Sequence, residues 1–178
     1  MNRRFTLVAG LLVLVVAFAV VSTQTNQRNV SLIVANGTIV TMDAGRRVIA
    51  NGSVAIDGTD IVAVGSADVI GREFRSATTI DASGQVVLPG LINTHTHAPM
   101  VLYRGLADDL ALMEWLTKYI FPAEARTVSP EMVRAGTRLA ALEMIQSGTT
   151  TYADMYYFEE EIAKETKAAG LRGGGEGQ

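Results

Sequence analysis

The sequence contains no cysteine and only two histidines, and 6% of its residues are aromatic. Without cysteine the chain has neither a disulfide framework nor a thiolate metal site, so any metal must bind to His, Asp or Glu. The formal net charge of -3 provides no basic footprint for a nucleic acid, and we expect no such partner. A length of 178 residues suggests one domain with a small addition.

The longest apolar run lies near the start of the chain, behind a short basic segment, "MNRR". A basic start followed by such a run is typical of a secretory signal, and cleavage is plausible before Thr23. The run is also almost long enough for a spanning helix. We therefore expect either a signal peptide over residues 1–22 or a membrane anchor over residues 5–21. In both cases the body of the protein is exported, to the periplasm or the extracellular space, and membrane contact is limited to this segment.

Residues 30–88 have the composition of a small β-structure. Asn-Gly at 36–37 and Asp-Gly at 57–58 separate runs rich in β-branched residues, which is a strong hairpin signal. Ser-Gly at 83–84 indicates a third turn between two strands. The pattern predicts a small antiparallel sheet. A sheet of roughly 60 residues is marginal alone and needs other structure to pack against.

From Val86 onward the pattern changes to alternating strands and helices. The run "VVLPGLINTHTH" is almost continuously apolar, as expected of a strand buried on both faces. Ser129 and Pro130 predict the N-cap and first position of a helix over about residues 130–147. Its apolar positions at helical spacing are Met132, Ala135, Leu139 and Leu142. "TTTYADMYY" indicates a second strand, and "EEEIAKETKAAG" a second helix over about 159–169. This order predicts parallel strands with crossover helices.

Both histidines lie in one short segment, "NTHTHAPM". Residues two apart on a strand point to the same side, so His95 and His97 are expected to face one way at the carboxyl end of the first barrel-type strand. Parallel α/β barrels build their active sites at this end. Two neutral imidazoles there make half of a site suited to zinc or iron, although they could also be ordinary polar residues. Asp154, at the end of the second strand, could order such a site or cap a turn.

The segment "VVLPGLINTHTHAPMVLYRGLADDL" closely resembles the first barrel strand and following loop of the amidohydrolase superfamily. It is most similar to the branch that holds 5-methylthioadenosine/S-adenosylhomocysteine deaminases and triazine chlorohydrolases. The resemblance extends over about residues 31–172 and includes "FPAE", "SGTTTYADMY" and "GLRG". It implies an α/β fold in which a small antiparallel β-sandwich segment, residues 30–88, precedes the first βα units of a metal-dependent (β/α)8 barrel, residues 86–178. In this family the His-x-His pair binds one divalent metal, zinc or iron, and the resemblance assigns that role to His95 and His97.

The resemblance also implies a reaction, which is hydrolytic deamination of an adenine nucleoside by metal-activated water. The glutamate of "FPAE", Glu124, matches the residue that contacts the ribose hydroxyls in the nucleoside deaminases. A carboxylate can accept hydrogen bonds from two vicinal hydroxyls. Without the resemblance, the simpler interpretation of Glu124 is a solvent-exposed acidic residue in a loop. The alternative enzymes are a chlorohydrolase or another cyclic-amidine or guanine-type deaminase, with a heterocyclic amine as the small-molecule substrate.

The predicted barrel is incomplete. A full (β/α)8 barrel takes about 250 residues, and the family uses further histidines, a catalytic glutamate and a late aspartate on later strands. This chain has no third histidine, and its final "GGEGQ" is unlike the family. We therefore expect an N-terminal fragment without a complete catalytic set, and a non-catalytic product is the alternative function. The sequence determines neither the exact substrate nor the oligomeric state.

Overall fold

The computed structural model describes residues 27–175, which fall into two compact units, one ending at Pro89 and the other beginning at Gly90. The signal or anchor predicted over residues 1–22 lies outside the described residues. Between residues 27 and 175, no helix combines the length and the hydrophobicity that crossing a membrane requires. The two units are described separately below.

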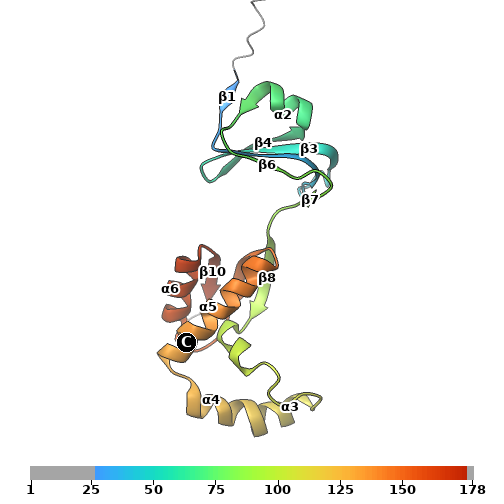
Figure 1. Cartoon of the computed structure of the whole chain (residues 1–178). Coiled ribbons are helices and arrows are strands. Elements are labelled where there is room, and N and C mark those ends of the chain that lie inside the picture. Colours follow the sequence, from blue (N-terminus) through green and yellow to red (C-terminus); the bar gives the residue numbers. More distant parts are fainter. Residues whose placement is uncertain (1–26, 176–178) are drawn as a thin grey trace, which may run out of the picture. The chain divides into compact units, whose positions relative to one another are not determined.

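The first unit is built on a mixed sheet (Figure 1). Its central strand β2 (Leu32–Val40) pairs antiparallel with β3 (Val48–Asp57), which pairs antiparallel with β4 (Asp60–Ser66). Two short strands, β6 (Thr79–Asp81) and β7 (Val86–Val87), pair in parallel with β2. The predicted sheet is therefore present, but it is mixed and not purely antiparallel.

A helix and a small strand pair complete this unit. Helix α2 (Ala67–Glu73) follows β4 and is capped by the Ser66 side chain. Strands β1 (Arg28–Asn29) and β5 (Phe74–Arg75) form a parallel pair. The helix buries Ile70 in a cluster with Val30, Ile33 and Ala55. The strand-rich pattern of the sequence did not predict α2, because its seven residues are too few for a clear helical period.

Only one of the three predicted hairpins is confirmed. The turn at 57–58 joins β3 to β4, with Gly58 at a positive φ of 62°. The hairpin at 36–37 is wrong, because β2 continues through it. Asn36 adopts a φ of 65° and the pairing with β3 shifts register there, so the Asn-Gly pair forms a bulge. The hairpin at 83–84 is also wrong, because the strands on either side of this turn both pair with β2 and not with each other.

The second unit is a three-stranded parallel sheet in the order β10-β9-β8. Helix α5 (Pro130–Gln146) leads from the end of β8 (Leu91–Thr96) to β9 (Thr149–Asp154). Helix α6 (Glu159–Ala169) leads from β9 to β10 (Arg172–Gly175). This arrangement confirms the predicted parallel strands and both predicted helices. Ser129 caps α5 by accepting the N–H of Met132, as its sequence pattern indicates.

Helical segments fill the long connection between β8 and α5. They are the 3-10 helix η1 (Ala98–Tyr103), helix α3 (Leu112–Trp115), the π-helical turn η2 (Leu116–Ile120) and helix α4 (Phe121–Thr127). The last three are consecutive and carry the chain in one helical run from Leu112 to Thr127. Figure 1 shows this run beside the carboxyl end of β8, the end that carries the histidines.

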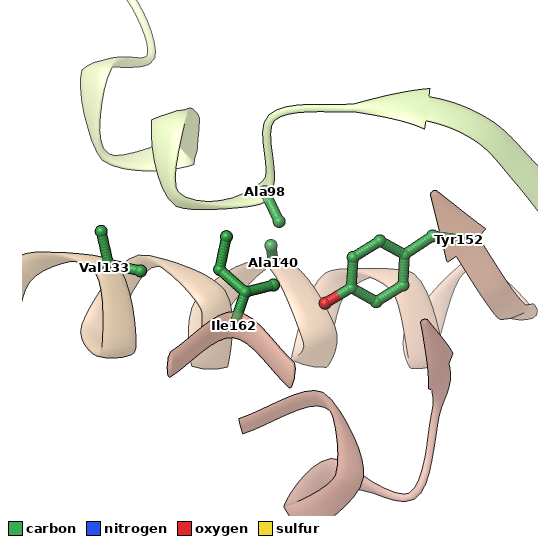
Figure 2. Packing of buried hydrophobic residues seen from close by; sticks show 5 residues of the cluster. All are labelled: Ala98, Val133, Ala140, Tyr152 and Ile162. Atoms are coloured by element: carbon green, nitrogen blue, oxygen red, sulfur yellow. The ribbon is translucent and has the colours of Figure 1, made fainter. Parts of the chain in front are cut away.

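The core of the second unit lies where α5 packs against η1, β9 and α6 (Figure 2). It consists of Ala98, Val133, Ala140, Tyr152 and Ile162. The apolar face predicted for α5 is wrong, since Leu142 is 52% exposed. The buried residues of α5 are instead Val133, Gly136, Thr137, Ala140 and Ala141. A Cβ atom on Gly136 would lie 2.5 Å from the carbonyl oxygen of Pro99, so η1 approaches the helix too closely for large side chains.

Strand β8 is more exposed than its apolar sequence predicts. Ile92 is 67% exposed, and the strand has no fully buried residue. The prediction of burial on both faces is therefore wrong for the part of the chain that the structure describes. At the start of β8, Gly90 is required for close approach, because a Cβ atom there would lie 2.1 Å from the Thr150 side chain.

Candidate active site

The two histidines lie together at the carboxyl end of β8. His95 is on the strand and is exposed, whereas His97 directly follows the strand, precedes η1 and is half-buried. Their ring centroids are 5.0 Å apart and the rings are nearly perpendicular, at 80°. The imidazoles are thus close enough to bind to the same ion.

An irregularity in β8 lies beside this pair. Asn93 pairs with Tyr152 and Thr96 pairs with Asp154, so three steps along β8 correspond to two along β9. The extra residue is a bulge, a feature that redirects side chains and occurs next to active sites. The direction of the His95 side chain therefore depends on this bulge as well as on the regular alternation of side chains along the strand.

The ring of His97 is oriented by the end of β9. Its Nδ1 atom lies 2.5 Å from the carbonyl oxygen of Met155. A carbonyl oxygen only accepts hydrogen bonds, so Nδ1 must carry the proton and donate. In the neutral imidazole the lone pair is then on Nε2, which is the state required of a metal ligand.

Asp154 is buried beside the histidine segment, with 6% of its surface exposed. Its Oδ2 atom accepts the backbone N–H of Ala98 over 2.7 Å, and its Oδ1 atom has no partner among the described residues. Burial raises the pKa of this carboxyl group to about 6, while the hydrogen bond from Ala98 opposes that shift. Of the two roles left open by the sequence, the contact with the residue after His97 favours ordering of the site.

Glu124 lies on α4 and faces the same pocket as His97. Its Oε1 atom accepts a hydrogen bond from the hydroxyl of Tyr156 over 2.8 Å. Burial and the neighbouring Glu124 carboxylate both raise the pKa of Tyr156, so its hydroxyl remains a neutral donor. His97 and Glu124 thus line one pocket. His95 is not in the lining of that pocket, although its ring lies 5.0 Å from that of His97.

The pocket has a volume of about 710 Å³ and mostly apolar walls. Its apolar lining includes Met100, Trp115, Leu116, Ile120 and Phe121. The indole N–H of Trp115 donates to the carbonyl of Leu106, which fixes one side of the wall. A cavity of this size with a few convergent polar groups is typical of a small-molecule site.

Tyr156 is a site residue that the sequence analysis did not identify. Its ring centroid is 6.3 Å from that of His97, and its hydroxyl reaches Glu124, so it contacts both halves of the pocket. The sequence does place Tyr156 two residues after Asp154, at the carboxyl end of a predicted parallel strand. Active sites of α/β barrels form at this end, so the position could have marked it as a candidate. Tyr157 also lines this pocket, and only the tertiary structure shows that Tyr156 is the tyrosine that reaches Glu124.

The donor set at this edge fits part of a metal site. His97 offers a free Nε2 lone pair, and the ring of His95 is beside it. Catalytic zinc sites usually have three protein ligands. Within residues 27–175, no group of three or more His, Cys, Asp or Glu side chains is placed to hold an ion. Among the described residues, two nitrogen atoms could therefore serve as ligands for such a centre.

A parallel βαβαβ unit with paired histidines at the carboxyl end of its first strand is the arrangement expected of the start of an α/β barrel with its site at that end. The model of the amidohydrolase family matches residues 86–178, and the chain belongs to this family. The fold and the family expected from the resemblance are thus confirmed.

The most similar relatives include deaminases. The chain is 53% identical over 141 residues to a 5-methylthioadenosine/S-adenosylhomocysteine deaminase of Syntrophobacter fumaroxidans, an alignment that covers 79% of this chain and 32% of that protein. The chain thus spans about a third of the length of the curated relatives it matches.

Solved structures show the same fold. An adenosine deaminase from Xanthomonas campestris with bound zinc superposes with a TM-score of 0.80 at 37% identity, covering 83% of this chain and 34% of that one. A zinc complex of atrazine chlorohydrolase from Arthrobacter aurescens superposes with a TM-score of 0.71 at 25% identity, covering 82% and 35%. The described barrel strands correspond to part of these barrels, and the sheet of the chain is not closed.

Proposed function

We propose that this chain contributes two metal ligands and a sugar-binding carboxylate to the hydrolytic deamination of an adenine nucleoside of the methylthioadenosine or adenosylhomocysteine type. The observation that carries the proposal is that His97 and Glu124 line one pocket, although they are far apart in the sequence. The names of the most similar relatives support the same reaction.

His95 and His97 would hold the metal, for which we propose zinc, with iron as the alternative. When bound, a divalent metal supplies activated water at neutral pH for attack on the purine carbon that carries the amino group. The role of His97 is to present Nε2 with its lone pair, since Nδ1 is committed to the carbonyl of Met155. The two zinc-bound neighbours support the choice of metal.

Glu124 would select a ribosyl substrate. Tyr156 occupies one side of its Oε1 atom and leaves the other carboxylate lone pairs available for two vicinal hydroxyls. The apolar wall beside Glu124 suits a purine ring, because Trp115 and Phe121 offer aromatic surface for stacking. A ligand held at both ends in this way is oriented before any chemistry occurs.

A chimera tests the proposal. Residues 27–175 of this chain replace the matching third of the Syntrophobacter relative, and ammonia release is measured with methylthioadenosine, adenosylhomocysteine and 5'-deoxyadenosine. We expect zinc-dependent turnover that His97→Ala abolishes. The unmodified chain should show no turnover above background, since it provides two histidines where such sites use three or more ligands. An inactive but folded, zinc-loaded chimera would overturn the proposal.

The chlorohydrolase reading is the second candidate, and the same chimera distinguishes it. Sequence identity to the chlorohydrolase structure is 25%, against 53% to the deaminase relative. The role proposed for Glu124 also requires a substrate with hydroxyl groups. Chloride release from atrazine without deamination of any nucleoside would favour this candidate.

We also propose that the body of the protein is exported, on the basis of the apolar run at residues 5–21. A cleaved signal predicts a mature chain that begins near Thr23, whereas an anchor predicts an intact chain in the membrane fraction. N-terminal sequencing of fractionated cells decides between them. An intact chain in the soluble cytosolic fraction would contradict both.

A further inference from the structure

Three hydrogen bonds join the end of β9 to the segment around His97. The N–H of Met155 donates to the carbonyl of Thr96 over 3.1 Å, and the Nδ1–H of His97 donates to the carbonyl of Met155 over 2.5 Å. The N–H of Ala98 donates to Oδ2 of Asp154 over 2.7 Å. Met155, which directly follows β9, therefore holds the backbone before His97 and its ring, and Asp154, the last residue of β9, holds the backbone after it.

On the β9 side, Asp154 is the residue that makes its bond through a side chain, whereas Met155 uses backbone atoms in both of its bonds. The position is unfavourable for a carboxylate. Only 6% of the surface of Asp154 is exposed, and its Oδ1 atom has no hydrogen-bond partner among the described residues. A buried polar group without full hydrogen bonding destabilises a fold. A carboxylate there is better explained by what it holds than by its contribution to stability.

What Asp154 holds is the peptide that leaves His97. The hydrogen bond to Ala98 spans 56 positions in the sequence, so it does not cap a local turn. Ala98 is itself buried in the core against α5, where Gly136 allows close approach of the neighbouring Pro99. The chain after His97 is thus fixed between a carboxylate on one side and a helix on the other.

We propose that Asp154 is a positioning residue for His97, which fixes the peptide after the histidine so that the ring donates through Nδ1 to Met155 and presents Nε2 to the pocket. The inference rests on the proposed function, because it assigns His97 to a metal. Without this anchor the ring would be free to exchange tautomers and orientations. Partners that orient a ligating histidine typically change metal affinity by about 10- to 100-fold.

The test uses the full 178-residue chain, kept in mild detergent because residues 5–21 are apolar. Labelling of histidine with ¹⁵N gives signals from only two rings, which a His95→Gln variant assigns. Long-range ¹H–¹⁵N spectra of the metal-free chain then report which nitrogen of His97 carries the proton. Zinc affinity of the same samples is measured by competition with a chromogenic chelator.

Two substitutions separate the hydrogen bond from the bulk of the side chain. Asp154→Asn keeps an acceptor for the N–H of Ala98, whereas Asp154→Leu has the same branching and no acceptor. Ile162→Val is the matched control, since it weakens the same core, in which Ala98 also lies, without removing a hydrogen bond to the histidine segment. Fluorescence of Trp115, the one tryptophan of the chain, verifies that each variant is folded, and Asp154→Ala replaces the leucine variant if that one unfolds.

We expect the wild type, Asp154→Asn and Ile162→Val to keep the Nδ1–H tautomer of His97 and to bind zinc within about threefold of one another. Asp154→Leu should give a tautomer mixture and bind zinc about 10- to 100-fold more weakly. An unchanged tautomer and unchanged affinity in Asp154→Leu would overturn the inference, as would an equal loss in Ile162→Val. Because the tautomer is read without metal or substrate, an inactive chimera would count against the proposed function and leave this result standing.

Discussion

The hydroxyl of Tyr156 donates to Oε1 of Glu124 over 2.8 Å and joins the end of β9 to helix α4 across the candidate pocket. The tyrosine ring also faces His97, at 6.3 Å between centroids. One residue that follows a strand therefore contacts both the histidine that would hold a metal and the carboxylate that would hold a sugar. If the proposed nucleoside binds here, the distance between its two ends would be set through this side chain.

Tyr156→Phe should weaken substrate binding more than turnover. The change removes the hydroxyl that orients Glu124, and the loss of a typical hydrogen bond is about 1 kcal/mol, or roughly fivefold in affinity. In the active chimera we expect KM for methylthioadenosine to rise by about that factor with little change in kcat. Tyr119→Phe is the control, because it makes the same change at a tyrosine that is 39% exposed and does not line the pocket. Equal effects of the two substitutions would contradict the role of Tyr156.

The unmodified chain should bind zinc weakly through its histidine pair. Two imidazoles provide fewer ligands than the three of a usual catalytic zinc site, and His95 is exposed to water. Either His95→Ala or His97→Ala should abolish the binding measured by chelator competition, while Glu131→Gln, which changes an exposed carboxylate on α5 outside the pocket lining, should not change it. Tight binding that survives His97→Ala would show that the ion binds elsewhere.

Gly136→Ala should destabilise the second unit although alanine favours helices. The added Cβ would lie 2.5 Å from the carbonyl oxygen and 2.7 Å from the Cα of Pro99, and both are backbone atoms that move little. Overpacking of this kind costs about 1–3 kcal/mol, against a gain of about 1 kcal/mol in helix propensity. Urea unfolding followed by Trp115 fluorescence should show a lower midpoint.

Gly71→Ala is the control for Gly136→Ala, because it makes the same change in a helix without a steric clash. Gly71 is also in a helix, but a Cβ atom there would meet nothing within 4 Å. Here only the propensity gain applies, so the first unit should become more stable by up to about 1 kcal/mol, as measured by circular dichroism. Stabilisation by both substitutions would show that η1 moves away from α5 easily.

Glu165→Gln should reduce the acid sensitivity of the second unit. The guanidinium of Arg138 donates two hydrogen bonds to Glu165, at 2.6 and 2.8 Å, and holds the pKa of that carboxyl below its usual range. A lowered folded-state pKa contributes stability above the unfolded-state pKa, and this stability is lost as the pH falls through the folded-state value. Between pH 7 and about pH 3, the wild type should therefore lose more stability than Glu165→Gln. Parallel curves for the two proteins would contradict the linkage.

Local signals in the sequence predicted the helices of the second unit well. The serine cap and proline at 129–130 define the start of α5, and the acidic start and glycine end of "EEEIAKETKAAG" define α6. These signals act within one or two turns of the chain. The buried face of α5 was not predictable in the same way, because it is set by the approach of Pro99, which only the tertiary structure shows.

The individual candidate residues of the site could be predicted from the sequence, but the way in which they come together in one pocket could not. Strand alternation indicated that His95 and His97 would be neighbours, and their rings are 5.0 Å apart. The role of Glu124 came only from the family resemblance, because nothing in its local sequence indicates that α4 meets the end of β9. The Asn-Gly pair at 36–37 predicted a hairpin turn, but it forms a bulge inside β2. A residue in the left-handed conformation fits either structure, so the local sequence does not distinguish them.

The bulge in β8 makes the number of residues in this segment as important as their identity. The strand is anchored to β9 at Asn93 and again at Thr96, with one more residue between the anchors than β9 has opposite them. A one-residue slip on a strand turns every side chain to the other face. A deletion at Thr94, which removes no ligand and no hydrogen-bonding side chain of the pocket, would therefore change the register of His95 against β9, although the two histidines would stay two residues apart. Among related sequences, selection should remove single-residue insertions and deletions in this segment even at positions where substitutions are neutral.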